Sequence, residues 1–488
     1  MLYGTALLLA SNIFVKGLGF FYRIVLVRTL GVEAMGLIEM VTPLFSLLLV
    51  VGGLGVQPAL SQLIAARRSK RDAYFQTGLR LLLLSGLLVT ALGYMLSAFL
   101  IRNFVPDTRI YLCFKLLLPA IFIISAASAY RGYFQGVRQV STLALSQNVE
   151  QLLRVVCGIW LAKLLCDRSV EIAVGATSVA TVCGETAGLL CLLICARRGR
   201  LRHRGAALRS SQLRDILSFG LPTTGGRLVS SIVLMLQAFL IPLSLQAAGW
   251  DTRAATEIYG RFAGVAMSLL HLPGVFTAAL TVSVLPAVAE SMSRDPQGRL
   301  LLQRRVNDAF EAAVTFTLPC MLLLYCFAEQ LCAAVFTAPL AAPILRLLAI
   351  GGVFLYLQIT AASVLQGLGA ARILLLNNII GGVILLAGVL LLTTLPQLGI
   401  LGAAIAVIVA WCGGFILNCA QILRIAHIRI RWWQTLLRPA AAVAAALTAW
   451  LLLPSGQSNT AALLVAAMMA AVYALTLFAL GGLRLKRP

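Results

Sequence analysis

Charged residues are scarce in this chain, and acidic residues are the scarcest. Of 488 residues, 11% are charged and 60% are hydrophobic, and only 16 are Asp or Glu against 39 Lys or Arg. A soluble domain has about 25% charged and about 45–50% apolar residues, so this composition excludes a water-soluble globular protein. It predicts an all-α polytopic membrane protein, because helices satisfy their own backbone groups inside a bilayer.

The residues of metal and acid–base chemistry are also sparse. The chain has three histidines and eleven cysteines with no Cys-x-x-Cys pair, and most of the cysteines lie in apolar runs. This pattern argues against a zinc site or a disulfide framework and favours cysteines as packing residues. No clustered His/Asp constellation and no Gly-rich phosphate loop with a Lys occurs. We therefore expect no metal, no cofactor and no enzymatic activity.

Fourteen apolar stretches are long enough to cross a bilayer, which takes about 20 residues. We expect them at 4–29, 35–66, 74–101, 110–136, 140–166, 170–196, 214–246, 254–289, 309–335, 341–366, 373–394, 399–423, 435–454 and 459–482. Loops at one set of helix ends hold 24 Lys or Arg, and those at the other set hold 4. Because cytoplasmic loops retain Lys and Arg, both termini are predicted to be cytoplasmic. Most of the net charge of +23 is explained in this way, without nucleic acid as a partner.

Two parts of the chain resemble copies of one six-helix unit. Residues 56–62 (VQPALSQ) match 284–290 (VLPAVAE), residues 134–137 (FQGV) match 365–368 (LQGL), and Gln147-Asn148 matches Asn377-Asn378 in the same order. Both copies begin on the same side, so the repeat is parallel, with a pseudo-twofold axis along the membrane normal. We expect an N-lobe (1–196), a basic linker (197–215), a C-lobe (216–424) and two C-terminal helices (435–482). Transporters place their substrate site at such a repeat interface.

Several cations lie deep within the expected spans. One face of the first helix carries residues three or four positions apart: Asn12, Lys16, Gly19 and Arg23. The seventh helix has a similar stripe: Thr223, Arg227, Ser230 and Gln237. A lone cation near the midplane costs about 2.5–3.5 kcal/mol, so it persists only with a partner or a watery cavity. No nearby acid is evident for Lys16, Arg23 or Arg227, which predicts a cavity that binds phosphate or pyrophosphate.

The other intramembrane charges allow two interpretations. The fifth helix contributes Gln147, Glu150, Gln151 and Arg154. Glu150 and Arg154 are four residues apart, so they either neutralise each other or place Arg154 in the cavity. Arg261 has the same two options, since Glu257 precedes it by four residues. For Arg131, toward the cytoplasmic end of its helix, snorkelling to the interface is one option. Glu150 and Glu185 are candidate ion-coupling carboxylates, although packing explains Glu185 equally well.

Four segments resemble one family across the chain: residues 16–26 (KGLGFFYRIVL), 133–136 (YFQG) followed by 145–155 (LSQNVEQLLRV), 221–228 (LPTTGGRL), and 258–260 (IYG) through 272–273 (LP). They look like the stage V sporulation protein B and polysaccharide-biosynthesis branch of the multidrug/oligosaccharidyl-lipid/polysaccharide (MOP) exporter superfamily. The resemblance implies a V-shaped alternating-access fold that moves undecaprenyl-linked glycans.

The related MurJ-type lipid II flippases have cavity cations on helix 1, and the resemblance carries over to this chain only in part. Lys16 matches the first of these cations, and Arg23 falls one position from the second. Their helix 2 arginine has no counterpart here, and Arg261 does not align with their helix 8 arginine. The last two helices of those relatives form a groove for the lipid tail, which implies the same for helices 13 and 14 here.

Together these features predict a flippase for an undecaprenyl-linked, pyrophosphate-bearing saccharide, such as a peptidoglycan precursor or a polysaccharide repeat unit. Lys16, Arg23 and Arg227 would bind the pyrophosphate, with Arg154 and Arg261 as further cavity cations. The expected partners are the lipid-linked glycan, the bilayer and cell-wall synthesis proteins. Two alternatives stay open: a cation-coupled multidrug exporter of the same superfamily, and a membrane scaffold for wall synthesis that transports nothing.

Overall fold

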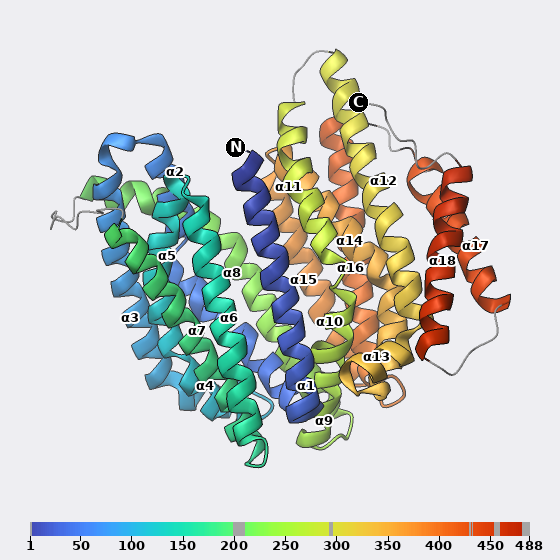
Figure 1. Ribbon diagram of the computed structural model, residues 1–488, viewed down its shortest axis with the longest axis horizontal. Helices are drawn as coiled ribbons and strands as arrows, with labels where there is room; N and C mark the ends of the chain where they lie inside the picture. The colour runs from blue at the N-terminus through green and yellow to red at the C-terminus, as the bar shows by residue number, and fades with distance from the viewer. Residues whose placement is uncertain are drawn as a thin grey trace. The chain divides into compact units, whose positions relative to one another are not determined.

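The structure is a computed structural model that describes residues 2–198, 210–291, 296–428, 431, 433–452 and 459–480. Every regular element within these ranges is a helix (Figure 1), which confirms the all-α fold class. Contacts divide the chain into two compact units. Unit 1 comprises Met1–Gln246 and Trp250–Gly260, and unit 2 comprises Ala247–Gly249 and Arg261–Pro488.

Unit 1 is built from long helices with short 3-10 turns between some of them. In chain order these are α1 (Leu2–Gly53), α2 (Val56–Ala66), η1 (Arg68–Lys70), α3 (Arg71–Phe104), η2 (Thr108–Ile110), α4 (Tyr111–Leu117), α5 (Pro119–Gly136), α6 (Val140–Leu165), α7 (Val170–Arg198), α8 (Ser210–Ala247) and α9 (Thr252–Tyr259). Its core includes the fully buried side chains of Tyr74, Phe75 and Leu60.

Unit 2 begins within a helix and continues to the C-terminus. Its elements are the π-helix η3 (Gly260–Ala266), α10 (Met267–Leu270), α11 (Gly274–Glu290), α12 (Pro296–Cys326), α13 (Ala328–Phe336), η4 (Pro339–Ala341), α14 (Ala342–Gly367), α15 (Ala371–Thr393), α16 (Ile400–Ala426), η5 (Trp433–Leu437), α17 (Arg438–Leu452) and α18 (Asn459–Ala479). Helices α17 and α18, red in Figure 1, pack on α12 through an apolar cluster that includes Ala442, Met469 and Leu322.

The element α1 is a hairpin of two helices, because the chain reverses at Gly31. Gly31 has φ 85° and ψ 173°, a conformation open to glycine and strained for other residues. Arg23 and Glu39 lie eight residues on either side of it and form an ion pair. In a straight helix, 16 residues would separate them by about 24 Å. This reversal confirms that 4–29 and 35–66 form separate helical segments.

The second expected span, 35–66, is broken where α1 passes into α2. Leu54 and Gly55 both have positive φ, 46° and 65°. A Cβ atom on Gly55 would lie 2.3 Å from the carbonyl oxygen of Gly220 and 2.7 Å from Oγ1 of Thr224. Only glycine therefore allows α8 to approach this break so closely.

The segment 254–289, expected as one continuous span, is interrupted twice. The backbone is π-helical over η3, and it turns at His271–Pro273 before α11 begins. Pro273 has no backbone N–H to continue a helix, which explains the second interruption. By length and composition, ten helices in the described part of the chain can cross a membrane, so the count of fourteen stays a prediction.

Helix α8 packs within unit 1, although it follows the basic segment that we expected to divide two lobes. Residues 199–209 of that segment lie outside the described residues. Asp215 on α8 accepts hydrogen bonds from Arg67 Nη1 at 2.5 Å and from the Tyr74 hydroxyl at 2.6 Å. The contact-defined boundary thus falls at Gly260, and the division into repeat lobes at 197–215 stays a prediction.

Candidate functional site

Four ionisable side chains of unit 1 meet between α5, α6 and α7. We call Arg131, Glu150, Arg154 and Glu185 the four-charge cluster. Arg154 Nη2 lies 2.7 Å from both Glu150 Oε1 and Glu185 Oε1. Arg131 Nη2 lies 2.7 Å from Glu150 Oε2 and 3.5 Å from Glu185 Oε2. Each arginine therefore bridges both carboxylates, and the cluster is neutral overall.

Glycine spacing on α7 allows the cluster to form. A Cβ atom on Gly184 would lie 2.8 Å from the carbonyl oxygen of Glu150, and one on Gly188 would lie 3.1 Å from the Glu150 Cβ. These two glycines are four residues apart and so share one face of the helix. That face lets α6 come close enough for its Glu150 and Arg154 to reach Glu185 on α7.

The contacts in the four-charge cluster test the interpretations made from the sequence for its members. The pairing of Glu150 with Arg154 is confirmed. Arg131, for which snorkelling was one option, has two acidic partners: its side chain is 14% exposed and contacts Glu150 and Glu185. Glu185 is a partner in ion pairs rather than a packing residue, and its Oε2 atom is buried without a hydrogen bond. Gln151 accepts a bond from Arg154 Nη1 at 3.3 Å.

Arg23 also has an acidic partner, which sequence inspection missed. Its guanidinium donates to Glu39, whose side chain is 16% exposed. The interpretation that no nearby acid neutralises Arg23 is therefore wrong. The partner lies on the returning arm of the α1 hairpin, and only the reversal at Gly31 brings the two residues together.

The residues of the predicted stripe on the first arm of α1 do not share one environment. A Cβ atom on Gly19 would lie 3.3 Å from Nε2 of Gln151, so this position faces α6. Asn12 and Lys16 are exposed instead. Within the described residues, no ion pair joins Lys16 to a carboxylate.

Arg227 lines a pocket that lies wholly within unit 1, which we call the Arg227 pocket. Its volume is about 190 Å³. It is lined by Leu49, Val50, Gly53, Gly55, Gln57, Pro58, Ile124, Ser128, Thr224 and Arg227, and thus by the α1–α2 break, α5 and α8. Arg227 is exposed and has no carboxylate partner in the described part of the chain. Lys16 is not among these lining residues.

The other predicted polar residues are more dispersed. The hydroxyls of Thr223 and Ser230 donate to carbonyl oxygens on their own helix, those of Gly220 at 2.8 Å and Gly226 at 3.1 Å. Gln147 and Gln237 are half-buried on α6 and α8. Arg261 is half-buried in η3 of unit 2 and has interactions of its own there.

A further polar network ties three segments of unit 1 together. Arg109 contacts Glu33 at 2.5 Å and Asp107 at 2.7 Å. Arg253 Nε lies 3.0 Å from Glu33, and the Thr256 hydroxyl donates to Asp107 at 2.8 Å. The network joins the turn of α1, the start of η2 and α9. Because its acids are paired with cations, it is a structural anchor rather than a ligand site.

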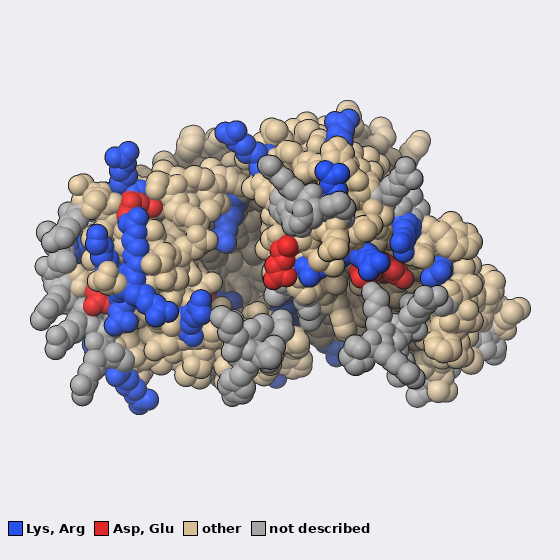
Figure 2. All heavy atoms as spheres, turned by 90° about the horizontal axis from the view of Figure 1, so that it is seen from above, with Lys and Arg blue, Asp and Glu red and all other residues tan. Residues whose placement is uncertain are grey.

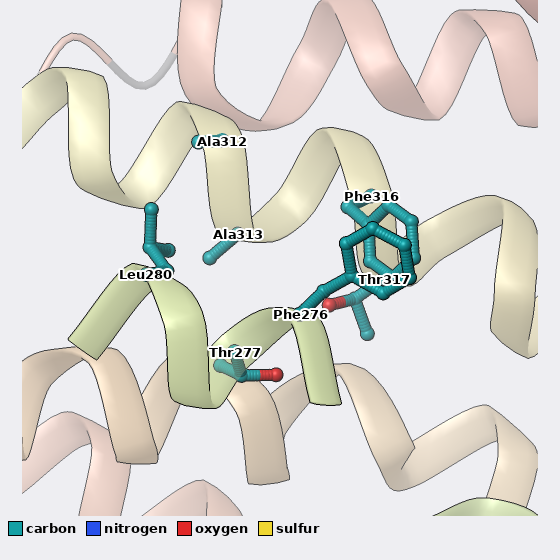
Figure 3. A pocket seen from close by; sticks show the side chains of 7 residues that line it. All are labelled: Phe276, Thr277, Leu280, Ala312, Ala313, Phe316 and Thr317. Carbon is teal, nitrogen blue, oxygen red and sulfur yellow. The ribbon is translucent and has the colours of Figure 1, made fainter. Parts of the chain in front are cut away.

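Unit 2 has an apolar pocket of about 210 Å³ between α11 and α12. Figure 3 shows the rings of Phe276 and Phe316 against each other at one end of it, and their centroids are 3.8 Å apart. Leu280, Ala312 and Ala313 cover the other end (Figure 3). With only two threonine hydroxyls in its lining, this pocket lacks the charge needed to bind a phosphate.

In the view of Figure 2, blue Lys and Arg side chains are widespread and red Asp and Glu ones are few. On unit 1, this view includes the end at which α2 turns into α3, and the exposed Arg68, Lys70 and Arg71 lie in that turn. The side of the membrane on which the termini lie stays a prediction.

Long apolar helices with cations inside them define a multi-pass membrane protein. The chain belongs to the family described as "Polysaccharide biosynthesis protein", which matches residues 1–292.

Two curated relatives and one solved structure are similar to this chain. Stage V sporulation protein B of Bacillus subtilis (strain 168) is 28% identical over 440 residues, covering 88% of this chain and 84% of the relative. Lipid II flippase MurJ of the same organism is 22% identical over 349 residues, covering 65% and 63%. A structure of lipid II flippase MurJ in an inward closed conformation matches with a TM-score of 0.75 at 14% identity, covering 96% of this chain and 98% of the other. The fold is shared with a multidrug resistance MATE family transporter of the MOP superfamily, and MurJ is by its name a flippase rather than an enzyme.

Proposed function

We propose that this protein flips an undecaprenyl-linked, pyrophosphate-bearing saccharide across the bacterial cytoplasmic membrane by alternating access. The saccharide would be a peptidoglycan precursor or a polysaccharide repeat unit used in cell-wall, spore-cortex or polysaccharide synthesis. In this proposal both termini are cytoplasmic, and wall-synthesis proteins act on the substrate before or after it is moved.

The observation that carries the proposal is the Arg227 pocket. Most of the intramembrane arginines considered above have acidic partners: Arg23 with Glu39, and Arg131 and Arg154 with Glu150 and Glu185. Arg227 has no such partner among the described residues, and it lines a hollow. An arginine at membrane depth with no acid to pair with is suited to an anionic ligand, and its planar guanidinium matches phosphate oxygens.

Lys16 is the second proposed ligand of the pyrophosphate, because it too has no carboxylate partner in the described part of the chain. Arg23 and Arg154 could join them only by exchanging a carboxylate for a phosphate. We therefore rank Arg227 and Lys16 first, and Arg23, Arg154 and Arg261 after them.

The test is a flipping assay in proteoliposomes that compares lipid II with other undecaprenyl-linked glycans. Arg227→Ala and Lys16→Ala should each reduce flipping at least tenfold while the protein still inserts and purifies normally. Arg80→Ala is the matched control, since Arg80 is a half-buried arginine of α3 that is absent from the pocket. Wild-type flipping by both variants would refute the proposed site.

A cation-coupled multidrug exporter is the second candidate, and the buried Oε2 atom of Glu185 is the observation that favours it. A carboxylate oxygen without a hydrogen bond could exchange a proton or bind a cation, with Glu150 beside it. In that case Glu185→Gln should abolish transport of a cationic dye, and Lys16→Ala should have little effect. The reverse result would support the flippase.

A further inference from the structure

Two uncharged polar side chains line the Arg227 pocket beside the arginine. They are Gln57 on the first turn of α2 and Ser128 on α5. Within the described residues, neither the amide of Gln57 nor the hydroxyl of Ser128 has a hydrogen-bond partner. Thr224, which lines the same pocket, differs from both because its hydroxyl donates to the carbonyl oxygen of Gly220 at 2.8 Å.

The backbone holds these two residues close to each other. A Cβ atom on Gly132 would lie 2.9 Å from the carbonyl oxygen of Gln57, so α5 packs directly against the start of α2. Ser128 precedes Gly132 by four residues and therefore lies on the same face of α5. Gln57 is placed in turn by the break at Gly55, which only glycine can form against α8.

Arg227, Gln57 and Ser128 have side chains suited to different parts of a ligand. An arginine supplies charge, whereas a glutamine amide and a serine hydroxyl both donate and accept hydrogen bonds without neutralising charge. Neutral groups of this kind suit the hydroxyl and amide groups of a sugar. The pocket, at about 190 Å³, is smaller than the roughly 300–1,000 Å³ of sites that enclose a whole drug-sized ligand. It can therefore hold only the part of a lipid-linked glycan where phosphate meets sugar.

We propose that Gln57 and Ser128 bind the sugar directly attached to the pyrophosphate while Arg227 binds a phosphate oxygen. This inference rests on the proposed function and specifies which part of the substrate the Arg227 pocket recognises. It makes recognition depend on the first sugar and leaves the rest of the glycan outside the Arg227 pocket.

The experiment measures the affinity of the purified full-length protein for two probes, undecaprenyl pyrophosphate and lipid II. Gln57→Leu and Ser128→Ala should each weaken lipid II binding by about three- to tenfold, the worth of one neutral hydrogen bond. Neither should change the affinity for undecaprenyl pyrophosphate by more than about twofold, since that probe has no sugar. Arg227→Ala should weaken the binding of both probes.

Gln62→Leu is the matched control, because Gln62 is an exposed glutamine of the same helix that does not line the pocket. Ser128→Ala removes a single oxygen atom, so a loss of lipid II affinity in this variant is not explained by misfolding. Equal losses for the two probes, or no loss for lipid II, would overturn the assignment to the sugar. If the unsubstituted protein binds neither probe, the proposed function itself fails and this inference fails with it.

Discussion

The four-charge cluster and the Arg227 pocket lie in the same unit, and both contain arginine at membrane depth. In the cluster, two arginines meet two carboxylates at 2.7–3.5 Å, and the side chains are 7–22% exposed. In the pocket, one exposed arginine lines a hollow with no acid beside it. A buried arginine can thus be stabilised by the fold alone, whereas an unpaired one needs water or a ligand.

This difference shows that an arginine inside an apolar helix is not necessarily a ligand-binding residue. Position within an apolar helix does not distinguish a ligand-binding arginine from a structural one, because Arg154 and Arg227 both lie well inside their helices. The presence of an acidic partner separates them. Removing an arginine of the four-charge cluster should therefore lower the free energy of unfolding strongly, and removing Arg227 should lower it weakly.

The largest effect is expected for Arg154→Ala. The substitution leaves Glu150 and Glu185 together with one arginine, so a buried carboxylate loses its close counter-charge. Breaking a buried ion pair in this way costs about 3–5 kcal/mol. Equilibrium unfolding of the purified protein in mixed micelles measures this cost. If Arg154→Ala proved as stable as the wild type, the cluster could not be a structural element.

An intermediate effect is expected for Gly55→Ala, which tests the backbone that forms one wall of the pocket. Alanine would have to adopt φ 65° and place its Cβ 2.3 Å from the Gly220 carbonyl oxygen. Residues held in such strained conformations cost about 1–3 kcal/mol. Gly53→Ala is the control, since Gly53 lines the same pocket but a Cβ there would meet nothing within 4 Å. Equal unfolding free energies for the two variants would show that the close approach of α8 is not required.

The smallest effect on stability is expected for Arg227→Ala. Surface substitutions that break no buried contact usually change the free energy of unfolding by less than about 0.5 kcal/mol. The same unfolding assay, run beside Arg154→Ala, gives the comparison. A loss as large as that of Arg154→Ala would mean that Arg227 has a structural partner, and the contrast between the two regions would disappear.

The ion pairs show why sequence reasoning found the helices but only part of the site. Glu150 and Arg154 are four residues apart on one helix, and helical geometry alone predicts their contact. Glu185 is 31 residues from Arg154, and Glu39 is 16 residues from Arg23. Their contacts depend on which helix faces bear on each other, which helical periodicity within one segment does not reveal.

The residues of the Arg227 pocket could also be predicted only in part from the sequence. Arg227 was identified from the sequence because a cation is rare in an apolar helix. Gln57 and Ser128 had no such signal, since isolated polar residues are common in helices of this kind. Only the tertiary structure identifies them, because it places α2, α5 and α8 around the Arg227 pocket.

The scarcity of charge by itself determined that this protein is helical and lies in a membrane, because apolar runs of this length have no other stable environment. The distribution of Lys and Arg along the chain likewise predicted an orientation. Tertiary structure alone decided which of the intramembrane arginines are neutralised, because the energy of a buried charge depends on atoms within a few ångströms. Those neighbours come from distant segments, brought together by the reversal at Gly31 and the close packing at Gly184 and Gly55.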